Sequence, residues 1–443
     1  MKSNLFMIIV LIFLMTTSFV SAAPKQPSFN VDWKTQIEAF EGISPTLKKE
    51  DKKLYNKIME VIQEPKVAIS VIEASNSEER SPVFDFLLGN LRLGEGDLVN
   101  AEEALLLSLK KYPRFKKAYH SLANVYLSKS DHSKALKYAL KVIELGGSIS
   151  AQLYSIIAYS HYSQEHYSSA LTAYRNARLY NSKHASYRWG ELYCLSQLGE
   201  HKEVISLVNE LMKDQKEDAK LLSLQANAYL ALGEPLKAMT NLELLYFKKL
   251  ADKQSLLLLS QLYFNEKIYL NSVDVLKEAL GKGADLKDVM ETLEALIHYN
   301  LIKEARDLSS EIEKKILMDK RNENERWLFA SAQLDLTGDE PELAVESLKR
   351  LLDKNPLHAS GIMQLARYFN KRNNRDEARF YFERAAYLEK VQFEAWQELG
   401  RLCWLEGDVE ASIGWFEKVY KVKPSASLQE TLGKMRQKLA LAQ

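Results

Sequence analysis

The feature that most constrains the fold of this chain is a mostly small residue that returns about every 34 positions. The intervals between successive copies are 34, 35, 34, 34, 34, 33, 39, 34 and 34 residues. The ten anchor residues are Gly89, Ala123, Ala158, Leu192, Ala226, Ser260, Leu293, Ala332, Ala366 and Gly400. A fixed period of this length predicts a repeat architecture, in which stacked copies of one unit share a continuous core.

A second residue with a small or medium-sized side chain follows each anchor after twelve positions. These residues are Ala101, Ala135, Ala170, Val204, Ala238, Ser272, Ala305, Ala344, Ala378 and Ser412. Two registers at one period predict two antiparallel helices in each unit, because a small side chain at a crossing lets the backbones approach to about 8–10 Å. Larger apolar residues such as Leu399, Leu402 and Phe416 would fill the sides of the crossing.

Turn and breaker residues fall at fixed offsets from the anchors. Gly96, Gly199, Gly233 and Gly407 stand seven residues after theirs, where the first helix should end in a left-handed residue. Three prolines, Pro113, Pro356 and Pro424, stand 24 residues after theirs, where the second helix should end. The offsets therefore predict both ends of the hairpin.

The pattern resembles the tetratricopeptide repeat, which has 34 residues and the signature W-x2-L-G-x2-Y…A-x3-F…P. The last unit matches it through Trp396, Leu399, Gly400, Ser412, Phe416 and Pro424, and departs from it with Cys403 at the tyrosine position. The resemblance covers about residues 82–424, ten units. It implies an all-α, right-handed superhelical solenoid of antiparallel helix pairs, a fold that many unrelated adaptor proteins share.

The regular array has irregular segments at both ends and one inside. We expect a signal peptide at 1–22, N-terminal helices with a degenerate capping repeat at 23–80, seven repeats at 81–315, three repeats at 316–424 and a capping helix at 425–443. The capping repeat would follow a short helix that begins at Val31. The 39-residue interval contains the charged segment 318–326, which predicts either a longer helix pair or a flexible joint.

The N-terminus has the pattern of a secretory signal. Lys2 precedes an apolar run from Leu5 to Leu14, and small residues follow, with cleavage expected after Ala22. The alternative is an uncleaved anchor, although Leu5 to Val20 is short of the roughly 20 apolar residues that span a bilayer. We therefore expect a protein exported to the periplasm, with no membrane span after cleavage.

Composition argues against several classes of function. With 60 basic and 59 acidic residues, the chain has no basic block for nucleic acid. Two cysteines, Cys194 and Cys403, are too few for a disulfide scaffold. The nearest histidines, His161 and His166, are five apart and would not share a helix face. No motif indicates catalysis, a metal site or a cofactor, so the sequence predicts that the protein is not an enzyme.

The first helices of such hairpins line the inner groove of a solenoid, so residues three before, one after and four after each anchor should face it. These positions predict a peptide-binding groove made of Phe86, Asn90, His120, Asn124, Tyr159, Tyr162, Trp189, Tyr193, Asn227, Gln261, Gln333, Arg367 and Arg401. Amides can satisfy the backbone of an extended peptide, and aromatic rings can anchor it. The alternative interpretation is a solvated face with aromatic residues that fill gaps between units.

The last third of this lining becomes basic, with Arg326, Arg367, Lys371 and Arg401. It does not reproduce the Lys and Asn clamp of chaperone-binding repeats, because Phe86 stands where the first lysine would be needed.

Segments 115–147, 221–245 and 255–280 resemble the periplasmic tetratricopeptide proteins that accompany TonB–ExbB–ExbD systems. That resemblance implies an accessory scaffold that contacts an energiser component or an outer-membrane receptor. Two alternatives are a scaffold of an envelope polysaccharide-export complex and a glycan-binding module in which Trp189 and Tyr193 stack on sugars.

Overall fold

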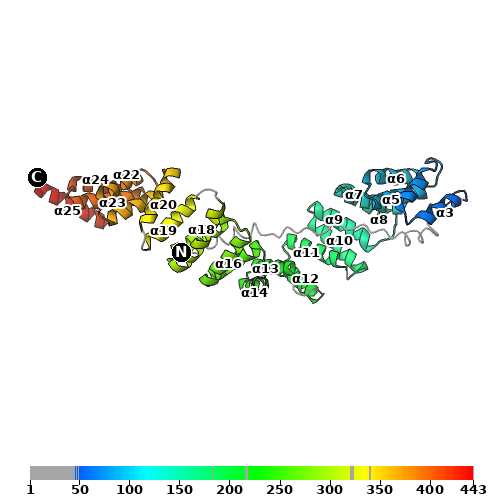
Figure 1. Cartoon of the computed structure of the whole chain (residues 1–443), viewed down its shortest axis with the longest axis horizontal. Coiled ribbons are helices and arrows are strands. Elements are labelled where there is room, and N and C mark those ends of the chain that lie inside the picture. Colours follow the sequence, from blue (N-terminus) through cyan, green and yellow to red (C-terminus); the bar gives the residue numbers. More distant parts are fainter. Residues whose placement is uncertain are drawn as a thin grey trace. The chain divides into compact units, whose positions relative to one another are not determined.

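The computed structural model describes residues 45, 47, 49–182, 184–214, 218–319, 324–338 and 341–442. Every regular element within these ranges is an α-helix, and the helices follow one another as hairpins (Figure 1). The predicted all-α repeat fold is confirmed. The predicted signal peptide at 1–22 and the short helix from Val31 lie outside the described residues.

The chain forms two compact units, which meet in the sequence between Lys248 and Lys249. The helices of the first unit are α3 (Lys52–Val61), α4 (Pro65–Glu73), α5 (Pro82–Gly94), α6 (Leu98–Lys111), α7 (Lys116–Ser128), α8 (His132–Glu144), α9 (Ala151–Ser163), α10 (Tyr167–Tyr180), α11 (Ala185–Leu198), α12 (His201–Asp214), α13 (Ala219–Ala231) and α14 (Pro235–Phe247). From α5 onward, each odd-numbered helix pairs with the helix that follows it.

The second unit continues the same pattern. Its helices are α15 (Lys253–Asn265), α16 (Tyr269–Gly281), α17 (Leu286–His298), α18 (Ile302–Asp319), α19 (Glu325–Leu336), α20 (Pro341–Lys354), α21 (Ala359–Lys371), α22 (Arg375–Ala386), α23 (Gln392–Glu406), α24 (Val409–Val422) and α25 (Ala426–Ala442). The charged segment 318–326 begins in α18, which is 18 residues long and packs against both α16 and α17. Residues 320–323 of that segment lie outside the described part of the chain.

The two small-residue registers meet where the helices of a hairpin cross. A Cβ added to Gly89 would lie 2.5 Å from Leu105 Cγ and 3.1 Å from the carbonyl oxygen of Ala101. In the last hairpin, the Ser412 hydroxyl donates to the Gly400 carbonyl at 2.7 Å. The crossings are thus too close for larger side chains on both helices, as the spacing predicts.

The predicted helix ends are also confirmed. Gly96, Gly199, Gly233 and Gly407 have φ angles of 81°, 74°, 74° and 84°, in the left-handed region. The helices α6, α20 and α24 each end two residues before the proline that was expected to stop them.

Additional helices cover both ends of the array. At the N-terminal end, α3 and α4 bury Ile58 and Ile72 in a cluster with Phe84 of α5. At the C-terminal end, Leu432 and Met435 of α25 are buried against Ile413 of α24, with Leu428 and Leu439 beside them. None of the described helices is both long and apolar enough to cross a bilayer.

Candidate functional site

The inner face of the first unit is defined here as the surface of the first helices α5, α7, α9, α11 and α13. Along it α5 contacts α7, α7 contacts α9 and α9 contacts α11, so these helices lie side by side without the second helices between them. The predicted peptide-binding groove was placed on this face, with residues three before, one after and four after the anchors as its lining.

The first two predicted amides of the groove are engaged inside the fold. Asn90 is fully buried, donates to the Phe86 carbonyl at 2.8 Å and accepts from the Ser121 hydroxyl at 2.7 Å. Asn124 is also buried and donates to the His120 carbonyl at 3.1 Å. Because these bonds tie α5 to α7 and brace α7, the two amides stabilise the helix stack rather than offer hydrogen bonds to a ligand.

The other predicted residues of these hairpins are apolar or neutral in character. Phe86 is buried, with its ring 4.9 Å from that of Phe115. Desolvation lowers the pKa of His120 to about 4, so its imidazole is uncharged at neutral pH. This end of the inner face therefore carries no charge from the predicted residues.

A cluster of aromatic residues occupies the inner face at α9 and α11. We name it the aromatic cluster: Tyr159, Tyr162, Trp189 and Tyr193. The Trp189 and Tyr193 rings are 5.7 Å apart, and Tyr162 and Trp189 both pack on the buried core that includes Tyr193. Tyr159, Tyr162 and Trp189 remain partly exposed, so the structure brings these predicted residues together on an accessible surface.

The environment of the cluster is apolar. Burial raises the pKa of Tyr162 to about 12, and burial also raises the pKa of Tyr193. Both phenols are therefore neutral at physiological pH and can donate hydrogen bonds. A partly exposed aromatic surface with neutral hydroxyl groups is a common feature of protein-binding sites.

The three predicted amides farther along the chain are partly exposed. They are Asn227 on α13 in the first unit, and Gln261 on α15 and Gln333 on α19 in the second. The Gln261 amide donates to Asn265 at 3.0 Å. Gln261 and Gln333 belong to the second unit, so of these three amides only Asn227 shares a unit with the aromatic cluster.

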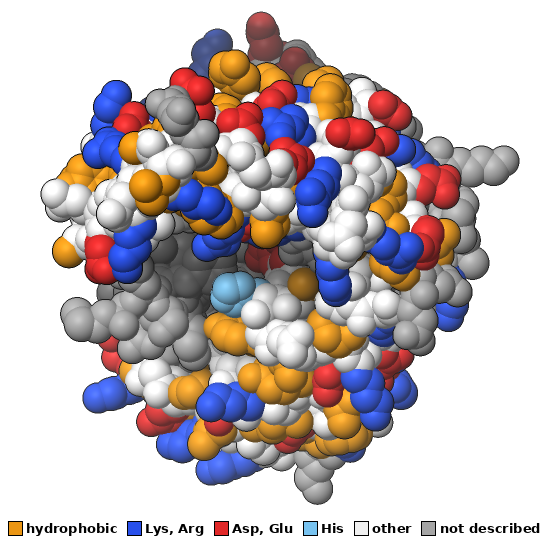
Figure 2. All heavy atoms as spheres, turned by 90° about the vertical axis from the view of Figure 1, so that its left-hand side faces the viewer, with side chains coloured by type: hydrophobic (Ala, Val, Ile, Leu, Met, Phe, Trp, Pro, Cys, Tyr) orange, Lys and Arg blue, Asp and Glu red, His pale blue; other side chains and the backbone are white. Residues whose placement is uncertain are grey.

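The predicted basic lining of the second unit is paired with acids. Arg326 makes two bonds to Glu294, at 2.7 and 2.9 Å. The exposed Arg367 and Arg401 pair with Glu394 at 2.7 Å and Glu398 at 2.8 Å. Acidic and basic side chains are likewise interspersed over the face seen in Figure 2. These pairs neutralise much of the positive charge expected from the sequence.

The structure corrects the geometry expected for the two closest histidines. His161 lies in the last turn of α9 and His166 precedes α10, so the turn between the helices brings their rings to 5.9 Å. Their five-residue spacing was interpreted as if both lay on one helix, which is why the contact was not predicted. The part of the chain that the structure describes contains no group of three or more potential metal ligands. Cys194 and Cys403 are buried free thiols.

An ionic network around the buried Glu191 was not predicted. Glu191 of α11 accepts from Arg175 of α10 at 3.0 Å and is also bonded by Arg178, which reaches Glu210 of α12. In the next hairpin, Gln225 bonds Asn209 at 2.8 Å and Asn241 at 2.9 Å. Glu191 and Gln225 each stand one residue before an anchor, and a polar residue at this position of the first helix is a signal that could have indicated both networks.

Comparisons with known proteins agree with the repeat pattern. Two family models described as tetratricopeptide repeat match residues 91–262 and 363–427, together more than half of the chain. No curated protein matches it significantly.

Several solved structures are similar to parts of the chain. A tetratricopeptide repeat protein from Parabacteroides merdae is 16% identical, with 54% of this chain and 96% of that chain covered and a TM-score of 0.36. YrrB, described as a repeat protein with an unusual peptide-binding site, is 17% identical, with 45% and 96% covered and a TM-score of 0.37. The Naa15/Naa10 complex bound to HypK is 11% identical, with 88% and 66% covered and a TM-score of 0.42.

Proposed function

Because the chain belongs to the tetratricopeptide repeat family, we propose that it is a non-catalytic scaffold that binds a segment of a partner protein on the inner face of its first unit. The observation that carries this proposal is the aromatic cluster on α9 and α11. Its rings pack on the buried core, and Tyr159, Tyr162 and Trp189 remain partly exposed, so these three can cover apolar side chains of a partner at little cost in conformational entropy.

We expect the Trp189→Ala variant to bind its partner at least about tenfold more weakly, since central aromatic residues dominate the energy of such interfaces. The measurement is co-purification of the tagged full chain with envelope proteins, followed by titration with the recovered partner. Trp415→Ala is the matched control, because Trp415 is a partly buried tryptophan on the second helix α24. Equal losses in both variants would contradict a role of the aromatic cluster.

The proposed partner class is a component of a TonB–ExbB–ExbD system or an outer-membrane receptor. It rests on the resemblance of segments 115–147, 221–245 and 255–280 to periplasmic accessory proteins of such systems. Co-purification from envelope extract should recover ExbB, ExbD, TonB or a receptor. Recovery of polysaccharide-export proteins alone would favour the alternative scaffold role.

This role requires export, which we propose occurs through cleavage after Ala22. The protein isolated from the periplasmic fraction should begin at Ala23. Mass spectrometry of its N-terminal peptide measures this directly, and a chain that retains Met1 in the cytoplasm would contradict both export and the proposed partners.

A second candidate function is glycan binding, favoured by the paired rings of Trp189 and Tyr193. An exposed aromatic ring can stack on one face of a sugar ring. Binding to a glycan array that is lost in Trp189→Ala would support it, and binding that persists in this variant would exclude the aromatic cluster as the site.

A further inference from the structure

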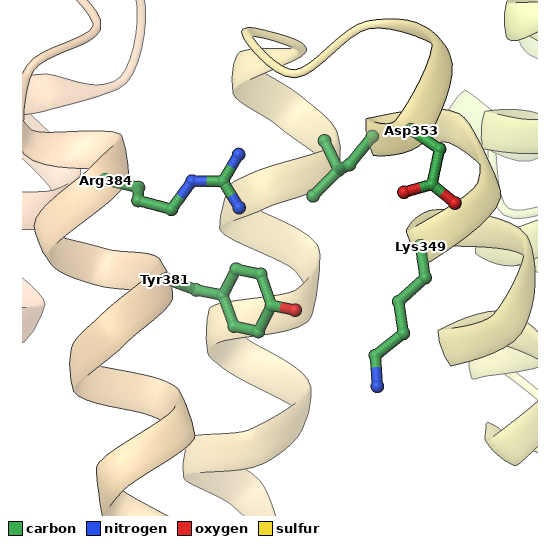
Figure 3. A pocket seen from close by; sticks show the side chains of 5 residues that line it. Lys349, Asp353, Tyr381 and Arg384 are labelled. Atoms are coloured by element: carbon green, nitrogen blue, oxygen red, sulfur yellow. The ribbon is translucent and has the colours of Figure 1, made fainter.

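A shallow pocket of about 390 Å³ lies between two second helices of the second unit, α20 and α22 (Figure 3). Lys349, Leu352 and Asp353 line it from α20, and Tyr381 and Arg384 line it from α22. Its volume is in the range of sites that take a small ligand or a single large side chain. None of these residues belongs to the predicted groove, so the pocket needs its own explanation.

Large apolar side chains are exposed around this pocket. Leu357 is 72% exposed, Phe380 54% and Tyr387 90%. Phe380 contacts Arg384, whose guanidinium carbon lies 5.6 Å from the Phe380 ring centroid. Leu357 follows Pro356, whose carbonyl accepts from Arg384 at 2.9 Å. Tyr387 is the C-cap residue of α22 and follows Arg384 by three residues. Such a concentration of exposed aromatic residues around an arginine is typical of binding surfaces.

The charges in the pocket favour an anionic group. Among the described residues, the ammonium of Lys349 has no ion-pair or hydrogen-bond partner, and Asp353 forms no ion pair with it although the two are four residues apart. The single acid is thus outnumbered by two cations, with their polar groups facing the gap between the helices (Figure 3). Burial raises the pKa of Tyr381, so its hydroxyl stays protonated and can donate a hydrogen bond.

We propose that this surface, the α20–α22 patch (Lys349, Leu357, Phe380, Tyr381, Arg384 and Tyr387), docks a protein segment in which an acidic side chain stands beside a large apolar one. The carboxylate binds between Arg384 and Lys349, and Tyr381 donates to it. The apolar side chain covers Phe380 and Tyr387, which would otherwise remain in water. This is a second interaction surface, in a different unit from the aromatic cluster.

The test is selection of a random twelve-residue peptide library, displayed on phage, against the full chain. Peptides recovered on the wild type and lost on the Lys349→Glu/Arg384→Glu variant should contain Asp or Glu next to Phe, Leu or Trp. Synthetic versions should bind at least about tenfold more weakly to Arg384→Gln and to Tyr387→Ala, as measured by fluorescence polarisation. Replacing their acids with Asn or Gln should reduce binding similarly.

Matched variants separate this proposal from the other outcomes. Arg375→Gln removes the same charge from the exposed start of α22, outside the pocket, and should leave binding unchanged. Peptides that lose affinity on Trp189→Ala but not on Arg384→Gln would bind the aromatic cluster, which would overturn this proposal and leave the proposed function intact. Recovery of no acidic peptide would also overturn the proposal. So would a dimer of the wild-type chain that the Tyr387→Ala variant no longer forms, because the patch would then bind a second copy of this chain.

Discussion

The Gly89→Leu variant is expected to be destabilised by about 3 kcal/mol, near the upper end of the usual cost of overpacking a core. Even the first atom of a side chain at this position would lie 2.5 Å from Leu105 Cγ, and the carbonyl of Ala101 closes the other side. The backbones of α5 and α6 would have to separate, which would disturb their contacts with α7. Urea unfolding followed by circular dichroism measures the loss, and amide hydrogen exchange localises it to α5–α7.

Two further variants make the reason for this loss specific. Gly414 also lies inside a helix, but a Cβ there would have nothing within 4 Å, so Gly414→Ala should stabilise α24 by about 0.5–1 kcal/mol. The double variant Gly89→Leu/Leu105→Ala should recover much of the lost stability, because the new leucine at 89 can occupy the volume that the Leu105 side chain leaves. If the double variant were as unstable as the sum of its two single variants, close packing would not be the cause.

The fold could be predicted because its crossings repeat a complementary pair of residues. At most crossings, the residue sixteen after the anchor compensates for the size of the anchor, although Ala123 with Ala139 and Leu192 with Val208 do not follow this rule. Gly89 is followed by Leu105 and Gly400 by Phe416, and a Cβ on either glycine would collide with that partner. The bulkier Leu293 is followed at the same offset by Ser309. Such compensation keeps the helix spacing constant, so a period in the sequence corresponds directly to a period in space.

The turn conformation was only partly predictable. Glycine marks it in four units, but Ser130, Glu165 and Lys267 adopt φ angles of 58°, 61° and 63° at the same offset. These residue types do not favour the left-handed region. The two packed helices impose the turn. The conformational energy of a left-handed residue is compensated by tertiary packing, which the conformational preference of a single residue does not include.

The candidate site could be located only in part, because residues at the same position of different repeats are not equally buried. Asn90 and Arg367 both follow their anchors by one residue, yet Asn90 is fully buried and Arg367 is exposed. The difference arises from the neighbouring hairpin, since Ser121 of α7 reaches Asn90 and closes the surface over it. Likewise, Glu294 lies 32 residues from the Arg326 that it neutralises, a pairing that helical spacing within one segment cannot reveal.

Removing the carboxylate of Asp85 is expected to cost about 3–5 kcal/mol, because Asp85→Ala breaks a buried ion pair and leaves its cations uncompensated. Asp85 is fully buried in α5 and pairs with Arg80 and Lys111. Lys111, at the end of α6, also donates to the carbonyls of Ser77 and Arg80. One carboxylate therefore joins the segment before α5 to both helices of the first hairpin. The midpoint of urea unfolding and hydrogen exchange in α4–α6 measure the loss.

The exposed pair of Arg92 and Glu73 provides the matched control for this prediction. Glu73 is 44% exposed, so Glu73→Ala removes a carboxylate from an arginine in water and should cost less than about 1 kcal/mol. Asp85→Asn should fall between the two, since it keeps an acceptor for Arg80 but removes the charge. Equal effects of Asp85→Ala and Glu73→Ala would show that burial does not set the energy of the Asp85 network. A loss of stability that decreases from Asp85→Ala to Asp85→Asn to Glu73→Ala would instead show that this network holds the capping helices to the repeat array.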